Sequence, residues 1–171
     1  EERERVSKQL EASPNNPLLY NLLGQLWMQA ADAGQAEIAF KKAIELDNSL
    51  LSAYMNLGQV YLTAGKTDQA VKEYEAVLAK DPKVLQAHML LGIIHEGRKE
   101  YDKAQARYEE ILKLNPKFWP AANNLAWILA EQRGNLDVAL SHAQTAREQK
   151  PDEAHIADTL GWIYYKKNTY L

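Results

Sequence analysis

Apolar residues return in the same order about every 34 residues along this chain. In residues 51–84, Tyr54, Leu57 and Tyr61 are three or four residues apart, which places them on one face of a helix. A second helical pattern follows in the same stretch, and Pro82 ends it because proline cannot continue a helix. Each stretch of this length therefore predicts two helices joined by a short turn.

A leucine followed by a small residue marks the same place in every repeat. The small residues are 34, 34, 34 and 35 residues apart: Gly24, Gly58, Gly92, Ala126 and Gly161. Sixteen residues after the glycines of the first three repeats comes an aromatic ring: Phe40, Tyr74 and Tyr108. A larger side chain at the small position would hold the two helices of a repeat apart, so we expect a close approach there.

These residues resemble the tetratricopeptide repeat, a helix–turn–helix unit of about 34 residues with the pattern W-x-x-L-G-x-x-Y … A-x-x-x-F … A … P. The resemblance covers essentially the whole chain and implies an all-α fold, a right-handed α-solenoid of antiparallel helix pairs. We divide this one continuous domain into the tail helix of a preceding repeat, four repeats and the truncated first helix of a fifth: 1–13, 17–50, 51–84, 85–118, 119–153 and 154–171. We expect a window of a longer array whose apolar ends favour self-association.

The repeat pattern departs from its rule at a few places. The fourth repeat carries one extra residue around Gly134. Gly34 lies three residues later in its repeat than Gly65 does, so we expect the first turn between helices to be displaced by about one helical turn. His88 and His95 occupy positions that the repeat uses for its core, and we expect both side chains to be packed there.

Residues 123–167 are similar to the closing units of bacterial tetratricopeptide proteins of the cell envelope, including exopolysaccharide-export and secretion-associated lipoproteins. Those arrays often contain an N-L-A … D-T-L-G-W-x-Y pair, which begins here at Asn124 and at Asp158. The resemblance leaves the compartment open: a soluble protein in the cytoplasm, or one in the bacterial periplasm or associated with the envelope.

The composition narrows the classes of function. Hydrophobic residues make up 46% of the chain and charged residues 25%, as in folded globular proteins. The absence of cysteine removes disulfides, thiolate metal sites and cysteine nucleophiles. A net charge of −3 argues against a protein that binds RNA one base per repeat. No apolar run approaches the roughly 20 residues that a membrane-spanning helix needs.

The sequence carries no motif of a known catalytic site. It has no glycine-rich phosphate loop, no G-x-S-x-G and no H-E-x-x-H. His88 and His95 are two helical turns apart, roughly 10 Å, and their spacing supplies no further metal ligands. We therefore predict a protein that is not an enzyme and has neither a cofactor nor a metal site.

The face of each first helix opposite its core stripe is the candidate binding surface. It is formed by positions 2, 5, 6 and 9 of each repeat, and in a right-handed stack these helices line the concave side. Of the twenty residues there, only Asp158 is formally charged. Amides can both donate to and accept from a peptide backbone, while methionine and tryptophan supply anchor area. The predicted peptide-binding residues are Asn21, Gln25, Met55, Asn56, Gln59, Met89, Asn123, Asn124, Trp127, Asp158 and Trp162.

We therefore predict a scaffold that binds a protein or peptide ligand of low charge along its concave face. Family members that grip a C-terminal carboxylate use lysine and arginine at positions 2, 5 and 6, and this chain has none there, which argues against such a clamp. One alternative is a structural protein that forms oligomers or filaments through its ends. Another is that the amides and apolar residues of this face simply pack between neighbouring helices.

Overall fold

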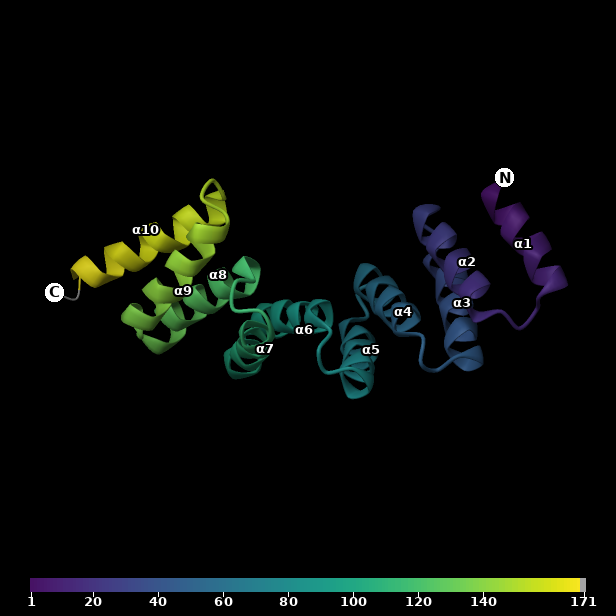
Figure 1. Ribbon diagram of the computed structural model, residues 1–171, viewed down its shortest axis with the longest axis horizontal. Helices are drawn as coiled ribbons and strands as arrows, with labels where there is room; N and C mark the ends of the chain where they lie inside the picture. The colour runs from purple at the N-terminus through teal and green to yellow at the C-terminus, as the bar shows by residue number, and fades with distance from the viewer. Residues whose placement is uncertain (170–171) are drawn as a thin grey trace. The chain divides into compact units, whose positions relative to one another are not determined.

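The protein is built from helices, and in this computed structural model, which describes residues 1–169, no strand occurs (Figure 1). The all-α prediction is therefore confirmed. The chain forms two compact units, residues 1–87 and residues from 88 onward. None of the helices in the described part is both long enough and apolar enough to cross a bilayer.

The N-terminal unit holds five helices and the start of a sixth within its described residues: α1 (Glu2–Ala12), α2 (Pro17–Gln29), α3 (Ala33–Leu46), α4 (Leu51–Thr63), α5 (Thr67–Lys80) and α6 (Leu85–Gly97). The C-terminal unit continues α6 and adds α7 (Tyr101–Leu114), α8 (Trp119–Ile128), the π-helical turn η1 (Leu129–Arg133), α9 (Leu136–Gln149) and α10 (Ala154–Thr169). Successive helices are joined by short turns, as the punctuation of the sequence by prolines and glycines predicts.

Local side-chain hydrogen bonds define where several helices begin. Pro17 is the first residue of α2, and the side chain of Asn16 accepts hydrogen bonds from the backbone N–H of Leu18 and Leu19. Asp32 does the same at the start of α3, where it accepts from the backbone N–H of Gln35 at 3.0 Å. These caps satisfy donors that have no partner within the helix.

The turn inside each of the first three repeats has one common geometry. The fifteenth residue of each repeat takes a positive φ: 57° at Ala31, 72° at Gly65 and 60° at Lys99. The next residue donates its N–H to the carbonyl five residues earlier, as Asp32 does to Trp27 at 3.0 Å. This is the hydrogen bond that closes a Schellman motif at a helix end.

The expected displacement of the first turn is wrong. Helix α2 ends at Gln29, the same repeat position at which α4 ends, and Gly34 lies in the first turn of α3. Backbone hydrogen bonds close this turn, so Ala31 adopts the left-handed conformation in spite of its Cβ. The position of the glycine therefore did not indicate the position of the turn.

The close approach of paired helices is confirmed in three repeats. A Cβ atom added at Gly24, Gly58 or Gly92 would lie 2.5 Å from a ring carbon of the aromatic residue sixteen positions later. The rings concerned, Phe40, Tyr74 and Tyr108, are fully buried. In the fourth repeat the chain has Ala126 and Ala143 at the corresponding places, and both are fully buried. In this repeat the small side chain of Ala143, in place of an aromatic ring, leaves room for the Cβ atom of Ala126.

The two core histidines are buried as predicted. His88 is 4% exposed and His95 is 5% exposed. His95 Nδ1 lies 2.5 Å from Glu100 Oε2, and this hydrogen bond is the main cause that lowers the pKa of Glu100. The repeat position that usually holds an aromatic ring therefore holds, at His95, a buried polar ring with a carboxylate partner.

The extra residue of the fourth repeat is taken up by η1. Asn135 donates its N–H to the carbonyl of Leu129 at 3.2 Å, and Gly134 takes a φ of 64°. A π-helical turn accommodates one more residue than an α-helical turn and changes the direction of the side chains within it. The residues of η1, among them Glu131, are therefore placed differently from the ends of the other first helices.

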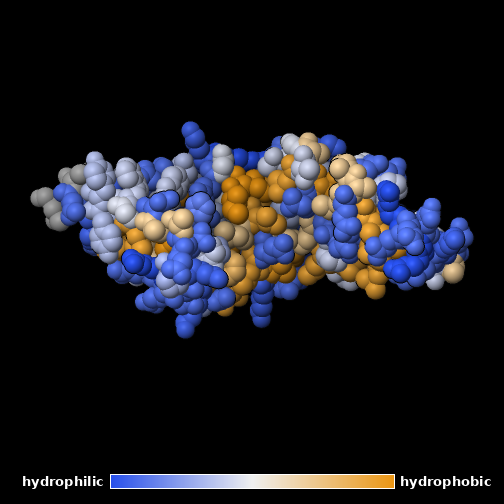
Figure 2. Space-filling view, turned by 90° about the horizontal axis from the view of Figure 1, so that it is seen from above, coloured by the Kyte–Doolittle hydropathy of each residue, from blue (hydrophilic) through white to orange (hydrophobic). Residues whose placement is uncertain are grey.

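Several large apolar side chains stay exposed on the described surface, and Figure 2 shows hydrophobic patches bordered by hydrophilic residues on one face. The most exposed are Leu18 and Ile38 at 62%, and Tyr165 at 59%. Single exposed apolar residues are normal in folded proteins. Tyr165, however, lies on α10 with exposed Tyr164 and Trp162, so three aromatic rings gather on one helix.

Candidate functional site

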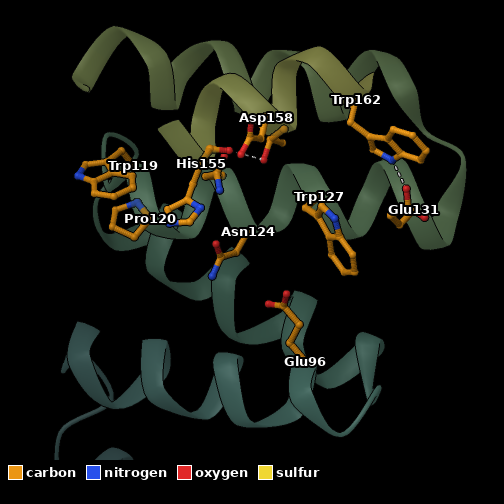
Figure 3. A pocket seen from close by; sticks show the side chains of 11 residues that line it. Glu96, Trp119, Pro120, Asn124, Trp127, Glu131, His155, Asp158 and Trp162 are labelled. Atoms are coloured by element: carbon orange, nitrogen blue, oxygen red, sulfur yellow. Dashed lines mark hydrogen bonds between the residues drawn. The ribbon is translucent and has the colours of Figure 1, made fainter. Parts of the chain in front are cut away.

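A groove of about 860 Å³ lies in the C-terminal unit, bordered by α6, α8, η1 and α10 (Figure 3). We call it the C-terminal groove. It is lined by Glu96, Trp119, Pro120, Asn123, Asn124, Trp127, Glu131, His155, Asp158, Thr159 and Trp162. Most of these residues come from two first helices of successive repeats, so the stacking of repeats creates the groove.

Indole rings form much of the groove wall. Trp119 and Trp127 of α8 are half-buried, and Trp162 of α10 is 41% exposed. The Trp127 ring contacts Tyr101, with the ring centroids 6.4 Å apart and the planes tilted by 51°. Trp162 stacks on Tyr165 at 5.4 Å. Aromatic contact therefore restricts two of the three indoles before any ligand arrives.

A chain of hydrogen bonds holds Glu96 at the wall that α6 contributes. The hydroxyl of Tyr108 donates to Glu96 Oε2 at 2.7 Å, and Asn124 Nδ2 donates to the Tyr108 hydroxyl at 3.2 Å. Burial raises the pKa of Glu96, and the Tyr108 hydrogen bond only partly opposes this effect. Burial likewise raises the pKa of Tyr108. Tyr108 therefore stays a neutral donor, and Glu96 is a carboxylate that is poorly solvated by water.

Glu131, a second carboxylate of the groove, is already paired within the protein. Lys166 Nζ lies 3.0 Å from Glu131 Oε1 and also donates to the carbonyl of Ala130 at 3.1 Å. Trp162 Nε1 donates a further hydrogen bond to Glu131. Burial raises the pKa of Glu131, but the hydrogen bonds from Lys166 and Trp162 outweigh it, so the pKa is lowered overall. These bonds attach α10 to η1.

One buried amide at the groove lacks the partner that its counterpart has. Asn21, at the fifth position of the first repeat, accepts a hydrogen bond from Asn56 Nδ2 at 3.0 Å. Asn123 is at the same position of the fourth repeat and is 8% exposed, yet no described residue bonds to its Oδ1. Thr159 takes the place of Asn56 there, but its hydroxyl donates to the carbonyl of His155 at 2.9 Å. Asn123 Oδ1 is therefore an acceptor that the described chain leaves unsatisfied.

The structure brings five of the predicted binding residues together in the C-terminal groove: Asn123, Asn124, Trp127, Asp158 and Trp162. Met89 belongs to the same unit and is half-buried, but it does not line the groove. The other predicted residues lie in the N-terminal unit. There Gln25 and Gln59 are exposed, and Met55 is half-buried.

The amides of the N-terminal unit bond to one another. Asn21 is 9% exposed, accepts from Asn56 and donates its own Nδ2 to Ser52 Oγ at 3.4 Å. These two hydrogen bonds use Asn56 Nδ2 and both the oxygen and the nitrogen of the Asn21 amide, and they join α2 to α4. The two amides thus have a structural contact of their own, whatever else they bind.

Sequence reasoning missed Glu96, Glu131 and Trp119 as groove residues. Glu96 and Glu131 are the twelfth and thirteenth residues of their repeats, one helical turn beyond position 9, the last position of the predicted face. A signal was available, because a stripe at positions 2, 5 and 9 continues at 12 and 13 on a helix. In the described part of the chain, no group of three or more His, Asp or Glu residues is arranged to hold a metal ion.

Comparisons with protein families find two matching models. The model for the cytochrome c-type biogenesis protein H TPR domain matches residues 6–122, and a tetratricopeptide repeat model matches residues 97–166. No curated protein matches the sequence. The tetratricopeptide resemblance of the sequence is therefore confirmed by family models that together span residues 6–166.

Solved structures with the same fold are numerous. MamA is 26% identical, with a TM-score of 0.77 over 89% of this chain and 88% of that one. YrrB, described as a TPR protein with an unusual peptide-binding site, is 25% identical, with a TM-score of 0.81 over 97% of this chain and 85% of that one. PilF of Pseudomonas aeruginosa is 22% identical, with a TM-score of 0.74 over 99% of this chain and 72% of that one. The predicted α-solenoid of helix pairs is thereby confirmed.

Proposed function

This chain belongs to the tetratricopeptide repeat family, among the TPR domains of cytochrome c-type biogenesis protein H, and we propose that it is a non-catalytic scaffold that binds a polypeptide segment in its C-terminal groove. The observation that carries the proposal is the groove itself. Its volume of about 860 Å³ lies within the range of roughly 300–1,000 Å³ that is common for ligand sites. It is also open along two helices, which suits a chain that passes through it.

The chemistry of the wall supports a polypeptide as the ligand. Trp119, Trp127 and Trp162 offer large apolar contacts, which often dominate the binding energy of peptide complexes. Asn124 bonds to Tyr108 through Nδ2, so its half-buried side chain keeps an oxygen that can accept from a backbone N–H of the ligand. The neighbour YrrB is described as peptide-binding, and we extend that property to this chain as part of the proposal.

The family description suggests the process in which the polypeptide takes part. We propose that the ligand is a polypeptide handled during cytochrome c-type biogenesis. A haem-free cytochrome c polypeptide is therefore the probe of choice. Folded, haem-containing cytochrome c is its control, because a folded protein cannot place an unfolded segment in the groove.

Binding can be measured by titrating the 15N-labelled chain with haem-free cytochrome c and following the indole N–H signals. We expect Trp127→Ala to weaken binding by roughly tenfold or more, as for other central aromatic contacts. Gln69→Ala is the matched control, because Gln69 is an exposed amide of α5 in the N-terminal unit and is not among the predicted binding residues. If Trp127→Ala keeps its helical circular dichroism and binds as tightly as the natural chain, the groove is not the binding site.

Self-association is the second candidate function, and the aromatic residues of α10 favour it. Tyr164 is 47% exposed and Tyr165 is 59% exposed, so α10 presents apolar ring surface that another copy of the chain could cover. Sedimentation at increasing concentration distinguishes the two functions. Under this alternative the mass rises with concentration, and the variant Tyr165→Ser lowers the association constant. A chain that stays monomeric over the same range excludes it.

A further inference from the structure

The groove wall is acidic and contains no cationic side chain. Three of its eleven residues carry carboxylates, and neither lysine nor arginine lines it. Lys166 neutralises Glu131 through an ion pair at 3.0 Å. No ion pair within the described residues involves Glu96 or Asp158. Two carboxylates thus face the groove without a cation of the protein's own.

Glu96 is the carboxylate that gains most from a bound cation. Tyr108 occupies its Oε2 atom, and no described residue bonds to Oε1. Burial has already made the ionised form of Glu96 costly, as its raised pKa indicates. A positive charge at hydrogen-bond distance would stabilise that form and replace the lost water. Figure 3 shows the Glu96 side chain directed toward Asn124 and Trp127, with Asp158 on the opposite helix.

Trp127 supplies the aromatic surface beside this carboxylate. The faces of indole rings attract cations, and the chain already uses this contact elsewhere. The guanidinium carbon of Arg3 lies 4.3 Å from the centre of the Trp27 ring, and Lys166 Nζ lies 5.2 Å from that of Trp162. No such internal cation lies over Trp127 among the described residues.

Resting on the proposed function, we propose that the partner polypeptide places a lysine or arginine side chain in the groove, between the Trp127 indole and the Glu96 carboxylate. Asn123, Thr159 and Pro120 offer the rest of the segment no charge to pair with, and Asp158 disfavours an acidic residue beside it. The groove extends along α8 and α10 and is longer than one side chain. We therefore expect it to bind a cationic residue that is part of a polypeptide. The groove thereby selects a basic anchor at Glu96 within a segment that carries no acidic residue.

The test uses two small probes of the same shape and different charge. Nα-acetyl-arginine methylamide and its neutral analogue Nα-acetyl-citrulline methylamide are titrated separately into the 15N-labelled chain. We expect the arginine probe to shift the Trp127 indole signal saturably and to bind roughly tenfold or more tightly than the citrulline probe. The Trp27 signal is an internal reference, because Trp27 lies in the N-terminal unit. The preference should shrink between about 50 mM and about 500 mM salt.

Two variants tie the preference to Glu96. Glu96→Gln keeps an oxygen that accepts from Tyr108 but removes the charge, so we expect it to bind the arginine probe only as tightly as citrulline. Glu75→Gln removes an exposed carboxylate of the N-terminal unit and should leave arginine binding unchanged. Equal binding of the two probes, or full arginine binding by Glu96→Gln, would overturn the inference.

The titrations with the polypeptide and with the two small probes distinguish a failure of this inference from a failure of the proposed function. If haem-free cytochrome c shifts the Trp127 signal while arginine and citrulline do so equally, a polypeptide site exists and the cationic anchor is wrong. If neither the polypeptide nor either probe shifts any groove indole, the proposed function itself is overturned.

Discussion

Gly58→Ala adds one carbon at the closest contact between paired helices. The new Cβ would lie 2.5 Å from Tyr74 Cε1 and 2.7 Å from Cζ, about 1 Å inside ordinary carbon–carbon contact. The ring is fully buried and lies between the helices, so it cannot swing away as the end of a flexible side chain can. Either the ring or the helix backbone must move.

Two effects of opposite sign determine the stability of this variant. Replacing glycine by alanine inside a helix stabilises it by about 1 kcal/mol. Overpacking a buried contact costs about 1–3 kcal/mol. We therefore expect Gly58→Ala to range from neutral to about 2 kcal/mol less stable than the natural chain.

Gly161→Ala is the matched control. Gly161 is the same repeat position in α10, and a Cβ added there meets nothing within 4 Å. It should therefore show the helix gain alone, about 1 kcal/mol. The difference between the two variants isolates the cost of overpacking, about 1–3 kcal/mol.

Amide hydrogen exchange is the suitable assay, because a stack of repeats does not have to unfold in one step. The free energy of opening is compared with that of the natural chain in α4 for Gly58→Ala and in α10 for Gly161→Ala. If Gly58→Ala slows exchange in α4 as much as Gly161→Ala slows it in α10, glycine is not required there by the neighbouring ring.

Three further predictions can be checked by urea unfolding. Tyr74→Phe removes a buried hydroxyl with no partner among the described residues, so the free energy of unfolding should hold or rise. Tyr108→Phe removes a hydroxyl that bonds to Glu96 and Asn124 and should cost about 1–2 kcal/mol. Equal losses in the two variants would contradict this difference. Lys99→Gly relieves a φ of 60° and should stabilise by about 0.5–1 kcal/mol, and a loss would refute that reading. A hydrogen bond from Lys41 lowers the pKa of Glu37 below its ordinary 4.5. The contribution of Glu37 is therefore present above that value and lost as pH falls through the lowered pKa. Glu37→Gln should destabilise at about pH 7, and its deficit should shrink steadily as pH falls below 4.5; a deficit that stays constant in acid would disprove the ion pair's role.

The helix pairs and their contacts could be predicted from the sequence because they depend on short spacings. Apolar residues three or four apart determine the buried face of each helix, and the glycine at Gly58 and the ring at Tyr74 recur in register. The geometry of the turns could not be predicted from residue type. Ala31 and Lys99 take the conformation that Gly65 takes, because the backbone hydrogen bonds of the turn outweigh the cost of their Cβ atoms.

The repeat pattern alone predicts a stack of helix pairs in which Trp127, Asn124 and Trp162 face the same side. Which of these polar residues bond to one another depends on how neighbouring repeats pack in three dimensions. Asn21 is joined to Asn56, whereas Asn123 has no such partner, although all three belong to the same predicted surface. The difference between the two kinds of information is one of distance. A helical wheel gives the direction of a side chain, but a hydrogen bond or an ion pair depends on atoms of neighbouring repeats that come within about 3 Å of each other.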